Sequence, residues 1–219
     1  MKGIAHSFER DTGHRLRVSL GSTGQLDAQI RNGAPFQVFL AADAETPLKL
    51  ERDGFTLAGS RFTYATGRLA LWSRQPDMVD PQGEVLRRIT TQRIAIAQPQ
   101  LAPYGAAAIE VMEHMGLLSI LQPRLVFGSN VAQAYQFAVT GNADLAFVAL
   151  SQITDEGRLK QGSAWVIPTN LHRPLDHDAV GLSNARHSAA ALAFLQYLRT
   201  DSVRSLIRTH GYATPNSIK

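Results

Sequence analysis

Three short segments place small residues or hydroxyl groups where a helix is expected to begin, an arrangement that can bind an anion. They are Gly21-Ser22-Thr23-Gly24, Pro103-Tyr104-Gly105 and Gly128-Ser129-Asn130. Each follows a segment that predicts a strand and precedes one that predicts a helix. The first N–H groups of a helix have no acceptor within it and lie at the positive end of its dipole. An oxyanion can therefore bind there without a charged side chain, although any one such start is more often an ordinary capped helix.

The elements that would position these segments alternate between helix and strand along the chain. Hydrophobic periodicity predicts helices over 1–12, 25–31, 44–52, 84–89, 106–115, 117–122, 131–140, 188–198 and 202–209. The same patterns predict strands over 15–20, 36–41, 62–73, 92–97, 125–127, 145–150, 164–167 and 179–182. This order indicates an α/β fold of mostly parallel sheets flanked by helices.

A chain of 219 residues is long enough for two modest domains. Gly67 interrupts the strand-like run at 62–73, where a strand could bend or pass between lobes. Pro168 follows the strand expected at 164–167, where the chain is expected to cross back to the first lobe. We therefore expect residues 1–66 and 169–219 to form a discontinuous first lobe and residues 67–168 to form the second.

Composition excludes several classes of function. The formal net charge is +4, but Lys and Arg are scattered rather than gathered into a nucleic-acid-binding surface. The chain has no Cys, which excludes disulfides, thiolate nucleophiles and Cys-based metal sites. It has no apolar run approaching the roughly 20 residues of a membrane span. We expect neither nucleic-acid binding nor membrane insertion.

Enzymatic and metal-binding alternatives have weak support. Glu110 and His114 lie four residues apart on an expected helix, which most simply makes a surface pair, and no HExxH motif is present. The densest group of ligand-type residues is read as a solvated loop: His172, Asp176, His177 and Asp178. No serine lies in a G-x-S-x-G setting. We expect no catalytic residue and no bound metal cation.

Taken in order, the motifs resemble the periplasmic molybdate-binding proteins of ABC transporters, a type II solute-binding family. The resemblance covers nearly the whole chain, and the order and spacing of its pieces carry it. These pieces are Gly21-Ser22-Thr23-Gly24-Gln25-Leu26, Gly33-Ala34-Pro35, Val38-Phe39-Leu40-Ala41-Ala42-Asp43, Pro103-Tyr104-Gly105, Asn130-Val131, Gly141-Asn142-Ala143-Asp144-Leu145 and His210-Gly211-Tyr212.

The resemblance implies a two-lobed protein that binds molybdate or tungstate in a cleft between its lobes, without a cofactor, and delivers it to a membrane permease. By this resemblance the hydroxyls of Ser22 and Thr23 are donors from the first lobe, and the backbone N–H groups of Tyr104 and Val131 are donors from the second. Supporting positions are Gly21, Pro103, Gly105 and Asn130. The resemblance also implies a periplasmic location and a monomer.

A molybdate ion is fully ionised at neutral pH, so a site made only of N–H and O–H donors matches it. Hydrogen phosphate must donate a proton and would find no acceptor. Sulfate is also a pure acceptor, so it must be distinguished by size, because each buried donor left unpaired costs about 1–3 kcal/mol. Binding of another tetrahedral oxyanion such as sulfate therefore stays an alternative, as does a ligand-sensing domain of a regulator.

The chain departs from the family pattern in three places. The family has another strand and a ligand-binding loop upstream of the first helix, and the resemblance begins after them. A molecule without that part would be expected to bind weakly. Ala149 stands where some members have Tyr, and Gln37 stands where a carboxylate is frequent.

Overall fold

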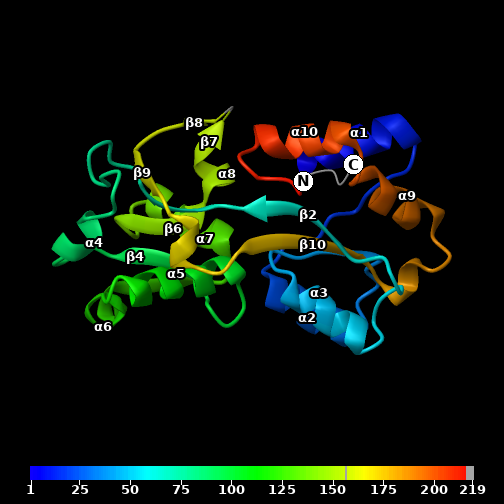
Figure 1. Cartoon of the computed structure of the whole chain (residues 1–219), viewed down its shortest axis with the longest axis horizontal. Coiled ribbons are helices and arrows are strands. Elements are labelled where there is room, and N and C mark those ends of the chain that lie inside the picture. The colour runs from blue at the N-terminus through cyan, green and yellow to red at the C-terminus, as the bar shows by residue number, and fades with distance from the viewer. Residues whose placement is uncertain (156, 216–219) are drawn as a thin grey trace. The chain divides into compact units, whose positions relative to one another are not determined.

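The computed structural model describes residues 1–155 and 157–215, which form two compact units (Figure 1). The first unit comprises Met1–Thr66 and Asp176–Lys219, and the second comprises Gly67–Leu175. The chain leaves the first unit after Thr66 and re-enters it at Asp176. The return therefore comes later than the expected boundary at Pro168, because the segment after Pro168 stays with the second unit.

A three-stranded sheet with helices on both faces forms the first unit. Its strands lie in the order β1-β10-β2, and β1 is antiparallel to β10. The strands are β1 (Val38–Leu40), β2 (Phe62–Gly67) and β10 (Leu175–Gly181). The helices are α1 (Lys2–Thr12), α2 (Thr23–Arg31), α3 (Glu45–Arg52), α9 (Ala189–Tyr197) and α10 (Asp201–Thr209), with a 3-10 turn η3 (Ser183–Ala185).

The central strand β10 supplies side chains to two separate cores, as the alternation of a strand requires. Ala179 packs in a cluster with α1, α9 and α10, whereas its neighbour Val180 packs in a cluster with α2 and α3. In Figure 1, α1 and α10 accordingly lie on one side of this sheet and α2 and α3 on the other. The first unit is thus a three-layer α/β/α sandwich.

A buried carboxylate holds β10 between its neighbours. Asp178 is fully buried (0% exposed), and its carboxylate oxygens accept hydrogen bonds from Arg61 (2.8 Å) and Thr63 (2.6 Å). Arg61 also donates to Glu51 at the end of α3 (3.0 Å). The backbone carbonyl of Asp178 accepts the Ala41 N–H (2.9 Å), which extends the β1–β10 ladder. A buried charge is tolerated only with such partners.

His177, the preceding residue of β10, is enclosed by aromatic rings. Its ring lies edge-on to Tyr64 and to Tyr212, with centroid separations of 6.0 and 5.4 Å. Beyond Tyr212 the chain pairs with β2, because Ala213 and Thr66 exchange both backbone hydrogen bonds (2.8 and 2.9 Å). The segment around Tyr212 therefore covers His177.

The second unit contains a mixed five-stranded sheet in the order β5-β4-β6-β3-β9. Strand β4 is parallel to β5 and β6, whereas β3 is antiparallel to β6 and β9. These strands are β3 (Leu69–Ser73), β4 (Ile94–Ala97), β5 (Leu125–Gly128), β6 (Leu145–Ala149) and β9 (Ser163–Val166), with a separate hairpin β7 (Thr154–Asp155) and β8 (Arg158–Leu159).

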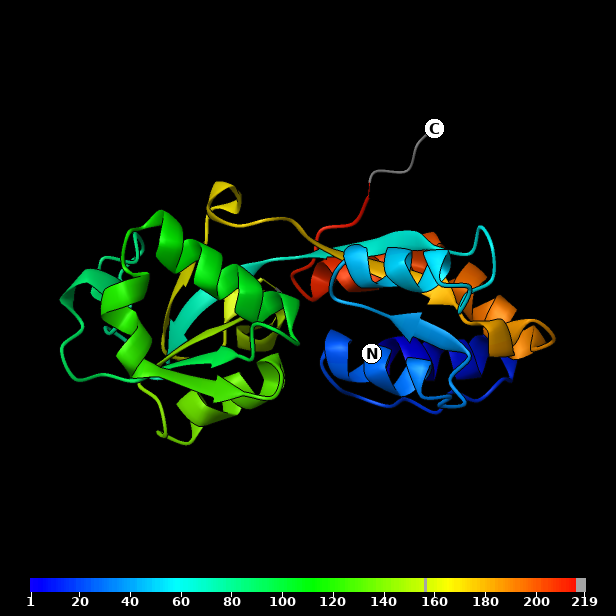
Figure 2. The ribbon, with the colours of Figure 1, turned by 90° about the horizontal axis from the view of Figure 1, so that it is seen from below.

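Helices cover this sheet on both faces, which Figure 2 shows from a second side. They are α4 (Val85–Arg88), α5 (Pro103–His114), α6 (Leu118–Leu121), α7 (Val131–Val139) and α8 (Leu150–Ile153), with 3-10 turns η1 (Gln122–Arg124) and η2 (Thr169–Leu171). Ala134 and Ala138 of α7 pack on Trp72 of β3 and Val148 of β6 in one core cluster. Among the described residues no helix has the length and apolar character of a membrane span.

The α/β class is confirmed, but three expectations are wrong. The five-stranded sheet is mixed rather than mostly parallel, because β3 is antiparallel to β6 and β9, and in the three-stranded sheet β1 is antiparallel to β10. Residues 15–20 form no strand; Leu16 packs on the core, but Val18 and Leu20 are 47% and 83% exposed. The expected solvated loop with His172, Asp176, His177 and Asp178 instead leads into β10, and His172, His177 and Asp178 are buried.

Burial lowers the pKa of His177 to about 4, against the opposing effect of Asp176. In the unfolded chain a histidine titrates near 6.5, so the unfolded state binds the proton first as the pH falls. The free energy of unfolding should therefore fall between about pH 6.5 and 4. In His177→Phe this decline should be shallower, as measured by denaturant unfolding at a series of pH values. His187→Phe, at an exposed position, should behave as wild type; equal slopes in all three proteins would contradict the assignment.

Candidate functional site

Ser22, in the first unit, is the N-cap of α2 and belongs to a reciprocal capping box. Its hydroxyl oxygen accepts the N–H of Gln25 (3.4 Å), and its own N–H donates to the Gln25 side-chain oxygen (3.0 Å). Ser22 is 5% exposed. Because the hydroxyl is an acceptor in this box, its proton is left to donate elsewhere.

Thr23, the first residue of α2, fixes the start of this helix to the chain beyond β1. Its hydroxyl oxygen accepts the N–H of Ala42 (3.1 Å), and the side chain is buried. This hydroxyl also keeps a proton to donate. Ser22 and Thr23 are therefore adjacent buried hydroxyls at the positive end of α2, held by contacts that leave their donor capacity unused.

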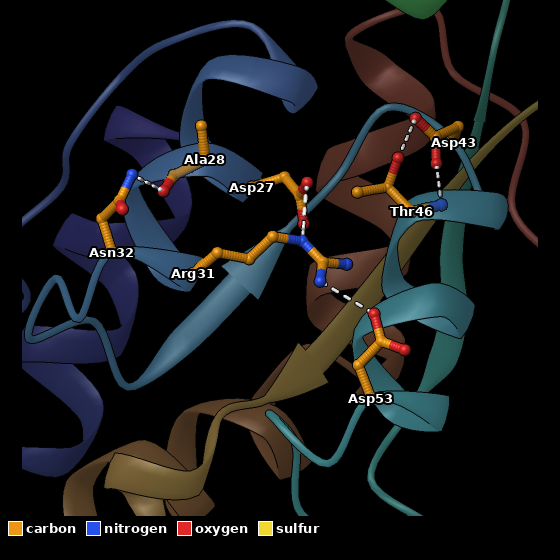
Figure 3. Close-up of polar contacts among 7 residues, drawn as sticks. All are labelled: Asp27, Ala28, Arg31, Asn32, Asp43, Thr46 and Asp53. Carbon is orange, nitrogen blue, oxygen red and sulfur yellow. Dashed lines mark hydrogen bonds and ion pairs between the residues drawn. The ribbon is translucent and has the colours of Figure 1, made fainter.

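The far end of α2 is fixed as well (Figure 3). Arg31 forms ion pairs with Asp27 one turn earlier (3.1 Å) and with Asp53 just beyond α3 (2.8 Å). Its guanidinium also lies 5.4 Å from the centre of the Phe55 ring. These contacts connect the end of α2 to the residues just after α3 and so hold α2 in place against α3.

The neighbouring helix α3 begins differently, because a carboxylate already occupies its start. Asp43 accepts the N–H of Thr46 (2.6 Å) and the Thr46 hydroxyl (3.1 Å), as Figure 3 shows. Burial raises the pKa of Asp43, and the two hydrogen bonds from Thr46 oppose that rise. Of these two adjacent helix starts, α2 thus carries neutral hydroxyls and α3 carries its own anion.

In the second unit, α5 and α7 begin at the same edge of the sheet. They follow β4 and β5, which are parallel, with Ala97 opposite Gly128 at their last residues. The Gln98 N–H then donates to the Gly128 carbonyl (2.8 Å) and continues the pairing past the strands. Tyr104 and Val131, the expected donors of this unit, consequently both follow the carboxyl edge of the sheet.

Tyr104 is the second residue of α5, after Pro103, and its side chain is 4% exposed. Proline suits the first helical position, where its missing N–H would have had no acceptor in the helix. Gly105 has a steric reason to be glycine, because an added Cβ would lie 2.1 Å from the carbonyl oxygen of Ala97. The first turn of α5 thus packs directly on the end of β4.

Val131 is the first residue of α7, so its N–H has no acceptor within the helix. The N-cap Asn130 accepts the N–H of Gln133 (3.0 Å), and Gln133 accepts the N–H of Ser129 (2.6 Å). The side-chain amide of Gln152 lies 3.4 Å from the Val131 carbonyl and also accepts the Ala149 N–H (2.9 Å). Sequence reasoning missed Gln152, because Ala149 at the N-cap has no side-chain acceptor and only the glutamine half of a capping box is present.

The residues weighed for metal binding or catalysis have structural partners, except that the buried Nε2 of His172 has no hydrogen-bond partner among the described residues. Glu110 binds Arg173 through the backbone N–H (2.7 Å) and the guanidinium (2.6 Å), which lowers its pKa against the effect of burial. In the described part of the chain, the His114 ring contacts the backbone carbonyl of Glu110 (2.8 Å) and not its carboxylate, so the expected Glu110–His114 side-chain pair is wrong. Among the described residues, no group of three or more His, Cys, Asp or Glu side chains could hold a metal ion.

The sequence model of the bacterial extracellular solute-binding proteins matches residues 1–213. The chain belongs to this family. Its relatives include the molybdate-binding protein ModA of Azotobacter vinelandii, 50% identical over 212 residues that cover 97% of this chain and 84% of that protein. ModA of Rhodobacter capsulatus is 46% identical over 213 residues, covering 97% and 83%.

Structural comparison agrees with the sequence relationship. The periplasmic molybdate-binding protein of Azotobacter vinelandii superposes with a TM-score of 0.93 at 43% identity, covering 98% of this chain and 94% of that one. The two-lobed solute-binding fold inferred from the sequence motifs is therefore confirmed. Family membership places this solute-binding protein among transport proteins rather than enzymes.

Replacement of Gly105 by Ala should destabilise the solute-binding protein, because the new Cβ would overlap the Ala97 carbonyl oxygen. Overpacking of this kind costs about 1–3 kcal/mol. Gly3→Ala is a matched control, because the nearest atom to its added Cβ lies 3.6 Å away on a flexible side chain. Denaturant unfolding should show a loss for Gly105→Ala and none for Gly3→Ala. An unchanged Gly105→Ala protein would contradict the close packing.

Proposed function

We propose that this protein binds molybdate, and tungstate in the same way, in the periplasm and delivers it to the membrane permease of an ABC transporter. The observation that carries the proposal is the 50% identity to a molybdate-binding protein over 97% of the chain. The fold match to a periplasmic molybdate-binding protein supports it. A protein of this kind needs no cofactor, and we expect it to act as a monomer.

The proposed ligand-binding atoms are the hydroxyls of Ser22 and Thr23 and the backbone N–H groups of Tyr104 and Val131. Two features of the chain support this choice: both hydroxyls serve as acceptors in their protein contacts, and Val131 opens its helix. Gly21, Pro103, Gly105 and Asn130 support these donors. The expected arrangement, in which one anion accepts from donors of both units, stays a prediction.

The chemistry of the donors matches a fully ionised tetrahedral dianion. Each oxygen of molybdate accepts hydrogen bonds and none donates, and each proposed contact atom is a donor. Hydrogen bonds to a charged acceptor contribute about 1.5–3 kcal/mol each, and micromolar binding requires about 8 kcal/mol in total. A handful of such contacts, formed without a counter-ion, is therefore sufficient.

The direct test is isothermal titration with molybdate and tungstate, with sulfate and phosphate as controls. We expect saturable binding of the first two with a dissociation constant of about 1 μM or below. Sulfate should bind more weakly because its shorter bonds leave donors unpaired, and hydrogen phosphate should not bind. Tighter binding of sulfate than of molybdate would show that sulfate is the ligand. Absence of binding by all four anions would refute the function.

A substitution at Val131 tests a backbone donor, which side-chain changes cannot do. Val131→Pro removes the N–H, yet proline is well tolerated at the first position of a helix. The extended backbone of Asn130 (φ −158°, ψ 173°) also suits a residue before proline. We expect molybdate affinity to fall about 10- to 100-fold, the value of one charge-assisted hydrogen bond.

Val131→Ala is the matched control, because it shortens the side chain and keeps the N–H. Its affinity should stay within about threefold of wild type, and both variants should unfold near the wild-type temperature. Equal affinities in Val131→Pro and Val131→Ala would show that this N–H does not bind the anion.

A further inference from the structure

We propose that Gln25 and Gln133 determine affinity for a dianion, because each caps its helix with a neutral acceptor where a carboxylate would fold as well or better. This inference rests on the proposed function. The independent reason for an anion at these helices is the relationship to molybdate-binding proteins. The two glutamines are positioning residues, since each acts through the backbone and hydroxyl groups beside it.

The two glutamines occupy equivalent places. Gln25 is the third residue of α2, and its side-chain oxygen accepts the Ser22 N–H (3.0 Å). Gln133 is the third residue of α7, and its side-chain oxygen accepts the Ser129 N–H (2.6 Å). In both helices the backbone N–H of the glutamine donates to the N-cap side chain. Each glutamine therefore satisfies a backbone donor just before the first turn.

Folding alone would favour glutamate at both positions. The capping box of α2 accepts Glu or Gln, a glutamate at 133 could accept the Ser129 N–H equally well, and the helix dipole stabilises a negative charge in the first turn. Helices α3 and α10 follow that preference with Glu45 and Asp201 in their first turns. Helices α2 and α7 have no acidic residue there, and neither do α1, α5 and α9; in α2 and α7 the acceptor at this position is a neutral glutamine.

An anion at the same helix ends reverses the preference. A carboxylate at position 25 would hydrogen-bond to the same residue whose hydroxyl is proposed to bind the dianion. Two negative groups within several ångströms repel each other, and the repulsion is stronger where less water surrounds them. Ser22 is buried, whereas the side chain at 133 is exposed, so solvent screens the effect more at α7 than at α2.

The test compares Gln25→Glu with Gln29→Glu, an identical charge change one turn further along α2 at an exposed position. Gln133→Glu is compared with Gln136→Glu on α7 in the same way, which gives a second, independent pair. For each protein, thermal unfolding is measured without ligand, and molybdate affinity is measured by isothermal titration at low and high salt.

We expect Gln25→Glu to unfold at or above the wild-type temperature and to bind molybdate at least tenfold more weakly. Gln133→Glu should lose about threefold or more, and added salt should reduce both losses. Gln29→Glu and Gln136→Glu should stay within about twofold of wild type. A merely structural role would not lower affinity while leaving stability intact.

The outcomes separate this inference from the function on which it rests. If wild type binds no molybdate, the proposed function fails and the inference fails with it. If wild type binds and both glutamate variants match their control variants, the function stands and the inference is wrong. If affinity and unfolding temperature fall together in both variants, the glutamines serve folding alone, which also overturns the inference.

Discussion

Two helices begin beside one another when the strands that precede them are parallel neighbours ending at the same edge of a sheet. In the second unit the parallel pairing of β4 with β5 meets this condition. Glycine makes it sterically possible: a Cβ on Gly105 would meet the Ala97 carbonyl at 2.1 Å, and a Cβ on Gly128 would meet the Ala134 nitrogen at 2.7 Å. Close backbone packing therefore fixes the start of α5, and at α7 it acts together with the caps formed by Asn130 and Gln133.

In the first unit, polar contacts position the start of α2. Asp178, neutralised by Arg61 and bonded to Thr63, keeps β10 at the centre of the sheet. The backbone carbonyl of Asp178 accepts the N–H of Ala41. The next residue, Ala42, donates its N–H to the Thr23 hydroxyl oxygen. Hydrogen bonds through Asp178, Ala41 and Ala42 thus connect the Arg61–Asp178 ion pair to the Thr23 hydroxyl at the start of α2.

Local motifs such as helix caps could be predicted from the sequence, but contacts between residues far apart in the chain could not. The caps at Ser22 and Asn130 involve residues three positions away, so the helix starts could be predicted. The alternation of Leu16, Val18 and Leu20 predicts a strand but says nothing of a partner strand, and Val18 and Leu20 are exposed. Asp176, His177 and Asp178 suggested a loop because their partners, such as Thr63, lie more than a hundred positions away.

The discontinuity of the first unit has a consequence for the order in which it can fold during synthesis. Strands β1 and β2 share no hydrogen bonds with each other, because β10 lies between them. A chain made from its N-terminus completes the second unit, Gly67–Leu175, before β10 is available. Residues 1–66 are therefore synthesised well before the strand that completes their sheet, and that sheet forms only after the whole second unit has been made.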